Sequence, residues 1–227
     1  MTDAAQASAA ILRAGDITLT YQDGRNVIYA VKGVDLTIAA GEFVGILGPS
    51  GSGKTSLLYA LSGIRRPVSG QVYLNGQPLD AAGSSRETLR RRTFGFVFQQ
   101  NFLINYLNVV QNIVVGALRE DAESRERSRA LVERLGMAGL EHRKPYELSA
   151  GQRQRVAIGR AMVNEPLVLF ADEPTANLDH ATGATVMELL TEIQEQTALV
   201  VVSHDETVLE GADTLYRMWE GELERIR

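Results

Sequence analysis

Residues 48–55 read Gly-Pro-Ser-Gly-Ser-Gly-Lys-Thr and lie between an apolar run, 43–47, and a helix-like run, 56–61. Glycines at this spacing let successive backbone N–H groups converge on an anion, and the following helix start adds positive potential. Lys54 can reach the outer phosphates of a nucleotide, and the Thr55 hydroxyl can bind Mg²⁺. The alternative, a glycine-rich turn that binds nothing, fits the restrictive spacing poorly, so the sequence predicts a phosphate-binding loop for a nucleoside triphosphate. The expected contacts are Gly48, Pro49, Ser50, Gly51, Ser52, Gly53, Lys54, Thr55 and Ser56.

The composition is that of an ordinary globular chain. It has 227 residues, 44% of them hydrophobic and 22% charged, so it can bury a sizeable core. The formal net charge of −5 argues against general nucleic-acid binding, and the absence of cysteine excludes disulfides and thiolate metal sites. The N-terminus lacks a signal-peptide pattern, and no apolar stretch reaches the roughly 20 residues that cross a bilayer. Any membrane role is therefore expected to come through a partner.

The first third of the chain is predicted to be rich in β-strands. Residues 1–12 are alanine-rich and are expected to form a loose tail. Beyond them, apolar and polar residues alternate over 17–21 and again over 34–38, and 27–31 has the composition of a strand. Asn75-Gly76 is a hairpin signal. These patterns together predict an antiparallel β subdomain at the N-terminus.

The rest of the chain changes character twice. Helical signals dominate from about 104 to 164, where Asp121 and Arg125, and likewise Glu123 and Arg127, have the spacing of i,i+4 ion pairs. Short apolar runs at 167–171 and 199–202 are typical of buried parallel strands and flank an amphipathic helix.

The predicted fold class is therefore α/β. We expect a P-loop NTPase core with a mainly parallel sheet, formed by 13–98 and 165–227, into which an α-helical subdomain is inserted over about 99–164.

Two carboxylates follow the predicted strand at 167–171. Ligands of parallel α/β sheets collect at the carboxyl ends of the strands, which is where Asp172 and Glu173 stand. Asp172 suits the outer shell of Mg²⁺, and Glu173 suits a general base for an attacking water. The alternative is a pair of exposed loop acids, and the phosphate-binding loop in the same chain argues against it.

A second helix start carries a serine and a glycine. In Leu148-Ser149-Ala150-Gly151-Gln152, Ser149 and Gln152 have the spacing of a capping box, which requires no ligand. The functional alternative is an anion site, in which the serine hydroxyl and the glycine amide face a γ-phosphate. One triphosphate does not need two such helix starts from one chain. In a dimer, the second helix start of each chain would bind the triphosphate held by the other chain, so both helix starts would be used.

Three motifs, Gly48–Thr55, Leu148–Gln152 and Leu167–Pro174, occur in this order with fitting separations. Together they resemble the nucleotide-binding domain of ATP-binding-cassette (ABC) transporters, over residues from about 15 to 225. The resemblance implies a single ABC ATPase domain over 13–227, with ATP and Mg²⁺ as cofactors and a head-to-tail homodimer that sandwiches two ATP molecules. The implied contacts to the ATP of the partner subunit are Ser149, Ala150, Gly151, Gln152 and Asp179.

The resemblance also implies roles for single residues. Tyr21 matches an aromatic residue that stacks on adenine, although its alternation with apolar neighbours equally suits a core face. Gln99 is similar to the glutamine that reaches Mg²⁺ and the attacking water and links the two subdomains. His204 is similar to a histidine that contacts the γ-phosphate. Asp179 resembles part of a loop that reaches across the dimer, and it also suits a helix N-cap. The implied catalytic residues are Glu173, His204, Lys54 and Gln99, and the implied metal ligands are Thr55, Gln99 and Asp172.

Ala150 departs from the family pattern, in which two glycines follow the serine. We expect the methyl group at 150 to restrict φ and Gly151 to keep the more important backbone freedom. Activity is expected to survive, with altered coupling.

The residues within these motifs most resemble those of ATPases of the lipoprotein-releasing and macrolide-export type, whose permeases transmit motion across the membrane. The resemblance implies that the chain pulls on a separate integral-membrane permease docked on the helical subdomain, near 99–106. It would then lie at the cytoplasmic face of the inner (plasma) membrane, held peripherally by the permease, with no nucleic-acid partner.

Three alternatives stay open at this point. The first is a cell-division ABC ATPase, a class that shares many of the same motif residues. A soluble ABC ATPase of translation or DNA maintenance usually carries two cassettes, a long coiled coil or a zinc insertion, which this sequence lacks. A nucleotide sensor without turnover conflicts with Glu173 and His204.

Overall fold

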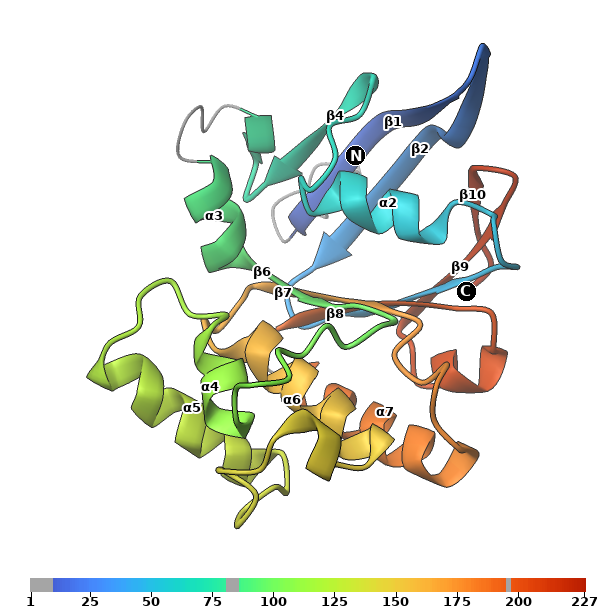
Figure 1. The fold of residues 1–227 in the computed structure, drawn as a ribbon. Coiled ribbons are helices and arrows are strands. Elements are labelled where there is room, and N and C mark those ends of the chain that lie inside the picture. The colour runs from blue at the N-terminus through green and yellow to red at the C-terminus, as the bar shows by residue number, and fades with distance from the viewer. Residues whose placement is uncertain (1–9, 81–85, 195–196) are drawn as a thin grey trace.

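The computed structural model describes residues 10–80, 86–194 and 197–227. Their strands form two sheets (Figure 1). The smaller sheet is antiparallel and has the order β2-β1-β4-β5, which confirms the antiparallel sheet predicted at the N-terminus. Its strands are β1 (Ala10–Asp23), β2 (Asn26–Ala39), β4 (Ser69–Leu74) and β5 (Gln77–Pro78).

The larger sheet has the order β10-β9-β3-β8-β7-β6. Neighbouring strands run parallel from β9 to β6, and β10 joins β9 in antiparallel orientation. The predicted α/β fold with a mainly parallel sheet is confirmed. The strands are β3 (Phe43–Leu47), β6 (Phe94–Val97), β7 (Val168–Asp172), β8 (Ala198–Ser203), β9 (Thr214–Trp219) and β10 (Glu222–Arg225).

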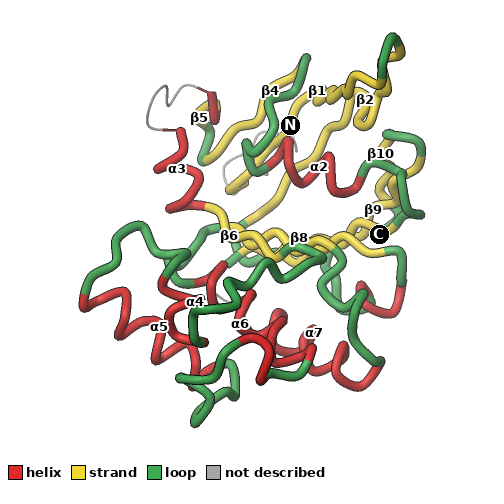
Figure 2. The backbone as a smooth tube through the Cα atoms, viewed as in Figure 1, coloured by secondary structure: helices red, strands yellow, loops and turns green. Residues whose placement is uncertain are grey.

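Helices cover both faces of the larger sheet (Figure 2). Helix α2 lies between the two sheets, whereas α4, α5, α6 and α7 lie on the opposite face. The helices are α2 (Lys54–Leu61), α3 (Arg86–Thr93), α4 (Val109–Val114), α5 (Ala122–Arg134), α6 (Ala150–Met162) and α7 (His180–Gln194). Short 3₁₀ turns are η2 (Pro145–Glu147) and η3 (Glu206–Leu209).

Alternate residues of the central strands face two separate cores. In β7, Val168 and Phe170 pack toward α2 and the smaller sheet, whereas Leu169 and Ala171 pack toward helices α4, α5, α6 and α7. This is the period of two that an extended strand imposes. Because both faces are covered, the strand is apolar from Val168 to Ala171, as in other buried parallel sheets, and only its last residue, Asp172, is charged. The two cores hold the carboxyl ends of the central strands, where the predicted site residues lie.

The N-terminal strands are longer than predicted. β1 begins at Ala10, so its first residues fall within the stretch 1–12 that was expected to be a loose tail; residues 1–9 lie outside the described part of the chain. Leu12 is fully buried and pairs with Ile38 and Leu74. The two strand signals at 27–31 and 34–38 belong to the single strand β2.

Between 104 and 164, a range that the structure describes in full, the elements are the helices α4, α5 and α6 and the turn η2, joined by loops and without a strand, as the dominance of helical signals predicted. The expected ion pair between Glu123 and Arg127 is confirmed at 2.7 Å, and the one between Asp121 and Arg125 is wrong. Asp121 caps α5 by accepting a hydrogen bond from the Ser124 backbone at 2.9 Å, and Arg125 instead contacts Glu120 at 3.0 Å. The boundaries of the helical insertion, 99 and 164, stay a prediction. In the described ranges, the chain contains no helix that is apolar and long enough to span a bilayer.

Candidate active site

A cavity of about 550 Å³ opens at the carboxyl ends of β3, β7 and β8, beside the β1–β2 hairpin. It brings together most of the residues that the motifs predicted. Its lining consists of Tyr21, Ile28, Tyr29, Ala30, Lys32, Ser50, Gly51, Ser52, Gly53, Lys54, Thr55, Ser56, Gln99, Glu173, His204, Glu220 and Gly221.

The phosphate-binding loop follows β3 and leads directly into α2. Gly51 and Gly53 adopt φ angles of 82° and 108°, in the left-handed region that favours glycine. A Cβ atom on Gly53 would also overlap the backbone oxygen of Ala30. Lys54 is 6% exposed, and its ammonium group donates to the backbone oxygens of Gly48 at 2.7 Å and Pro49 at 3.1 Å. The loop therefore depends on its glycines, and the Lys54 ammonium is held by its first two backbone carbonyls.

Thr55 and Asp172 form a compact set of oxygen donors. The Thr55 hydroxyl lies 3.0 Å from Oδ1 and 2.9 Å from Oδ2 of Asp172. Burial raises the pKa of the Asp172 carboxyl, and the hydrogen bonds from Thr55 act in the opposite direction. A hydroxyl beside a carboxylate fits a hard cation such as Mg²⁺, which prefers oxygen ligands. These two residues are therefore suited to hold the metal.

Glu173 lies at the centre of the polar contacts in the cavity. Its Oε1 is 3.4 Å from the Lys54 ammonium, and its Oε2 is 2.9 Å from Nδ1 of His204. The Ser203 hydroxyl lies 3.4 Å from the same Oε2. Glu173 has a φ of 48°, a conformation uncommon for residues other than glycine, and such strain concentrates at functional sites. The predicted base and the predicted γ-phosphate contact are thus in direct contact with each other.

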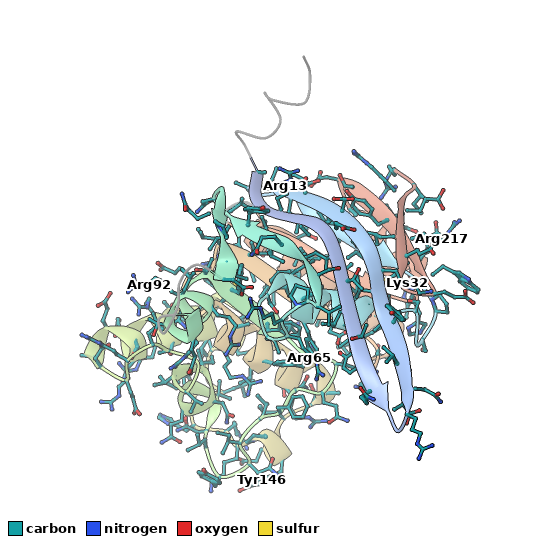
Figure 3. All side chains as sticks on the ribbon, turned by 90° about the horizontal axis from the view of Figure 1, so that it is seen from above. Arg13, Lys32, Arg65, Arg92, Tyr146 and Arg217 are labelled. Atoms are coloured by element: carbon teal, nitrogen blue, oxygen red, sulfur yellow. The ribbon has the colours of Figure 1, made fainter. Side chains whose placement is uncertain are left out.

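The core-face interpretation of Tyr21 is confirmed, and stacking on adenine stays a prediction. Tyr21 lines the cavity, and its ring also packs against the core that contains α2 and the smaller sheet. Its hydroxyl is 3.2 Å from the Ser56 hydroxyl. The Arg65 guanidinium lies 4.4 Å from the ring centroid and is not part of the cavity lining, so it covers the ring from outside. Figure 3 shows Arg65 beside the ribbon of the β1–β2 hairpin.

Gln99 follows β6 and lines two cavities at once. The second cavity, of about 390 Å³, also contains Ala150, Gln154 and Asn177 in its lining. The Asn177 side chain donates to the backbone oxygen of Gln99 at 3.1 Å. Gln99 therefore lies at the junction between the nucleotide cavity and the start of α6, where a residue that links two subdomains is expected.

The Ser149–Gln152 segment lies outside the nucleotide cavity of its own chain. The Gln152 backbone donates to the Ser149 hydroxyl at 3.2 Å, and the Ser149 backbone donates to the Gln152 side chain at 2.9 Å. This capping box confirms the structural interpretation of the spacing.

The expected reason for glycine at position 151 is wrong. Ala150 and Gly151 both lie in the first turn of α6, where φ is helical and a methyl group imposes no special restriction. Gly151 is required by packing instead, because a Cβ atom there would overlap the Thr182 methyl group of α7.

Asp179 is the N-cap of α7. Its carboxylate accepts hydrogen bonds from the Thr182 backbone at 3.0 Å and the Thr182 hydroxyl at 2.7 Å. The bond from the Thr182 hydroxyl is the largest of the causes that lower the pKa of Asp179, followed by the bond from the Thr182 backbone. The cap is therefore confirmed, and contact with a partner's ATP stays a prediction.

Sequence reasoning missed one wall of the nucleotide cavity and two supporting contacts, that of Asn177 with the Gln99 backbone and that of Arg65 with the Tyr21 ring. Ile28, Tyr29, Lys32 and Glu220 line the cavity from β2 and the β9–β10 turn. They belong to no motif, so the sequence carried no signal for them. Asn177 and Arg65 stood within or near the motifs, but their bonds depend on long-range folding.

Comparisons with known proteins agree with this geometry. A family model described as "ABC transporter" matches residues 31–176. The chain is 40% identical over 221 residues to the lipoprotein-releasing system ATP-binding protein LolD of Acinetobacter baylyi, covering 94% of this chain and 97% of that protein. It is 40% identical over 225 residues to the uncharacterized ABC transporter ATP-binding protein MJ0796 of Methanocaldococcus jannaschii, covering 95% and 96%. A dimeric structure of a post-hydrolysis state of the cassette MJ0796, bound to ADP and Pi, has a TM-score of 0.84 at 35% identity and covers 95% of this chain and 99% of that one.

Proposed function

The chain belongs to the ABC transporter family, and from this premise we propose that it is the ATP-hydrolysing subunit of a transporter of the lipoprotein-releasing type. The observation that carries the proposal is the convergence of three groups at one cavity, where Asp172 is bonded to the lining residue Thr55 without lining the cavity itself. The three groups are the Lys54 loop, the Thr55–Asp172 oxygen pair and the Glu173–His204 pair. The identity of 40% to LolD supports the transport subtype over a cell-division or soluble ABC ATPase.

The side chains divide the hydrolytic work between them. Thr55 and Asp172 would hold Mg²⁺, which would supply positive charge to offset the negative charge of the triphosphate. Lys54 would exchange its backbone acceptors for phosphate oxygens. Glu173 would accept a proton from the attacking water, and His204 would orient that carboxylate and contact the γ-phosphate.

A second copy of the chain is needed to complete the site. Ser149 is exposed and lies outside the nucleotide cavity of its own chain, so this segment is available to another molecule. A head-to-tail pair would place it against the partner's triphosphate, at a helix start that favours anions. The dimeric form of the neighbouring cassette MJ0796 supports this arrangement. ATP then binds the two copies together, and hydrolysis releases them.

The permease is proposed to dock beside Gln99, on the face formed by the loop after β6 and η2. Three aromatic side chains there are largely exposed: Phe102 at 62%, Tyr106 at 77% and Tyr146 at 71%. Figure 3 places Tyr146 at the edge of the molecule remote from the β1–β2 hairpin. Exposed aromatic residues are typical anchors of protein interfaces. Docking here would let the permease displace the loop that carries Gln99.

The substitution Glu173→Gln tests the hydrolytic proposal. Steady-state ATPase activity should fall at least about 100-fold, the lower end of general-base contributions, while ATP-bound dimers persist on a sizing column. Glu220→Gln is the matched control, because Glu220 lines the same cavity with a similar φ of 47°. Normal turnover by Glu173→Gln, or equal loss in both variants, would remove Glu173 from its role.

Serine substitutions at the three aromatic residues test the docking face. The triple variant of Phe102, Tyr106 and Tyr146 should keep its ATPase activity but no longer co-purify with a permease from detergent-solubilised membranes. Trp219→Ser, which removes an aromatic ring that is 60% exposed elsewhere, is the control. Recovery of the wild-type chain with ribosomes or DNA instead of a membrane protein would favour a soluble ABC ATPase.

A further inference from the structure

Arg160, near the end of α6, grips the loop that follows β6. Its Nη1 donates to the backbone oxygen of Phe102 at 2.7 Å, and its Nη2 donates to the backbone oxygen of Asn101 at 2.5 Å. Two parallel donors from one planar guanidinium fix both the position and the orientation of a short peptide segment. This contact joins residues that are 58 and 59 positions apart in the sequence.

The Arg160 charge is held by backbone carbonyls. Within the described ranges, no carboxylate lies within 4.0 Å of its guanidinium, and burial lowers the pKa of the group from its ordinary value. Burying a charge is costly unless it is hydrogen-bonded. Hydrogen bonds from a charged donor are stronger than neutral ones, so the two carbonyl contacts offset this cost. Arg160 is therefore partly buried and hydrogen-bonded to the loop, which distinguishes it from an arginine that is only solvated at the surface.

The loop at 99–104, which Arg160 contacts, has one strained residue and is hydrogen-bonded at both ends. Phe102 has a φ of 45°, which is an outlier for a bulky aromatic residue, although its side chain is 62% exposed. Upstream, Asn177 holds the backbone of Gln99, and downstream the Asn112 side chain accepts from the Ile104 backbone at 2.7 Å. Strained backbone persists where the surrounding contacts determine it. Arg160 supplies the central contact.

The other end of α6 carries Ser149, the residue proposed to meet the partner's ATP. One continuous helix therefore connects that contact to the Arg160 grip. A helix transmits displacement along its axis because its backbone is hydrogen-bonded throughout. Movement of the Ser149 end would carry Asn101 and Phe102 with it, and Gln99 lies two residues from the grip.

We propose that Arg160 is a positioning residue for ATP hydrolysis: it ties the loop at 99–104 to α6, so that Gln99 is presented to the active site by the movement of that helix. The inference rests on the proposed role of Gln99 at Mg²⁺ and the attacking water.

The test compares Arg160→Met with Arg155→Met. Arg155 lies on the same helix and donates to the backbone oxygen of Leu135 at 3.1 Å, away from the loop at 99–104. Methionine keeps much of the side-chain length and removes the donors in both variants. Arg160→Met should lower kcat by up to about 100-fold, the loss that a misplacement of about 1 Å can cause, and raise the Mg²⁺ concentration needed for half-maximal activity. The KM for ATP should stay within about twofold in both variants.

Arg155→Met should lower thermal stability to a similar degree without changing kcat or the Mg²⁺ requirement. Equal kcat values and equal Mg²⁺ requirements in the two folded variants would overturn the inference. If Arg160→Met does not fold, Arg160→Lys and Arg155→Lys are compared by the same two readouts, since lysine keeps the charge and part of the donor set.

A double-mutant cycle with Gln99→Ala separates this inference from the role of Gln99. Gln99→Ala alone should lower kcat, and adding Arg160→Met should then change kcat little further. If Arg160→Met lowers kcat by its full factor in the Gln99→Ala background, Arg160 does not act through Gln99 and the inference is wrong. If Gln99→Ala leaves kcat and the Mg²⁺ requirement unchanged, the role of Gln99 is wrong and the inference falls with it.

Discussion

Gly151→Ala should destabilise the chain more than its chemical size suggests. The added methyl group would overlap Cγ2 of Thr182, at the point where α6 approaches the first turn of α7. Thr182 cannot simply turn away, because its hydroxyl is held by the Asp179 carboxylate at 2.7 Å. Either that bond breaks or the start of α6 moves, and both outcomes disturb the segment proposed to contact the partner's ATP.

The size of the effect follows from the contact. Forcing one methyl group into a packed site typically costs about 1–3 kcal/mol, so we expect about 2 kcal/mol. In a chain of this length, about 1 kcal/mol shifts Tm by about 2–4 °C, which gives a fall of about 4–8 °C. Ala150→Gly, one position earlier, removes a methyl group instead of adding one and should cost about 1 kcal/mol, the difference in helix propensity.

Differential scanning fluorimetry of both variants measures these shifts, and Thr182→Ser supplies the decisive control. Serine keeps the hydroxyl that bonds Asp179 and removes the methyl group that would clash. The double variant Gly151→Ala/Thr182→Ser should therefore recover at least about 1 kcal/mol of the loss, a coupling energy typical of residues in contact. If Gly151→Ala melts with the wild type, or if Thr182→Ser restores nothing, the close approach of the two helices does not explain this glycine.

Two further predictions follow from the nucleotide cavity. Because burial raises the pKa of Asp172, its contribution to stability is full below the ordinary value of 3.8 and is lost as the pH rises through the raised value. Asp172→Asn should therefore melt above the wild type at pH 7, with a difference that shrinks on acidification, and should lack Mg²⁺-dependent hydrolysis; a difference independent of pH would contradict the assignment. Arg65→Ala should weaken ATP binding about two- to fivefold, the equivalent of an exposed cation–π contact of about 0.5–1 kcal/mol. Displacement of a fluorescent ATP analogue measures the affinity, with Arg65→Lys as the control, and unchanged affinity of Arg65→Ala would show that Arg65 does not support the Tyr21 ring.

The sequence predicted those parts of the molecule that depend on local spacing. The glycines of the phosphate-binding loop and the carboxylates after 167–171 are fixed by the strand–turn–helix geometry around them, so their place at one sheet edge followed from the pattern. The capping box at Ser149 is likewise a contact over three residues.

The contacts that failed or were missed are those in which several partners compete. The Asp121 carboxylate accepts a hydrogen bond from the backbone N–H of Ser124, in the first turn of its own helix, and does not pair with Arg125. Capping satisfies a backbone donor that would otherwise lack a partner. The role of Gly151 depends on a residue of another helix, which no local pattern reveals. The grip of Arg160 on the 99–104 loop is of the same kind, because it spans more than 50 residues of sequence.

The polar groups of the cavity are bonded to one another, and this has a consequence for nucleotide binding. Lys54 is shared among two backbone carbonyls and Glu173, and Thr55 is held by Asp172. A triphosphate with its metal must therefore exchange existing hydrogen bonds for new ones, so the net gain per contact is smaller than the contact count suggests. Release of Glu173 from Lys54 is part of the same exchange. The carboxylate that is freed when Lys54 turns to phosphate is the one proposed to act on water, so occupation of the phosphate-binding loop itself prepares the base.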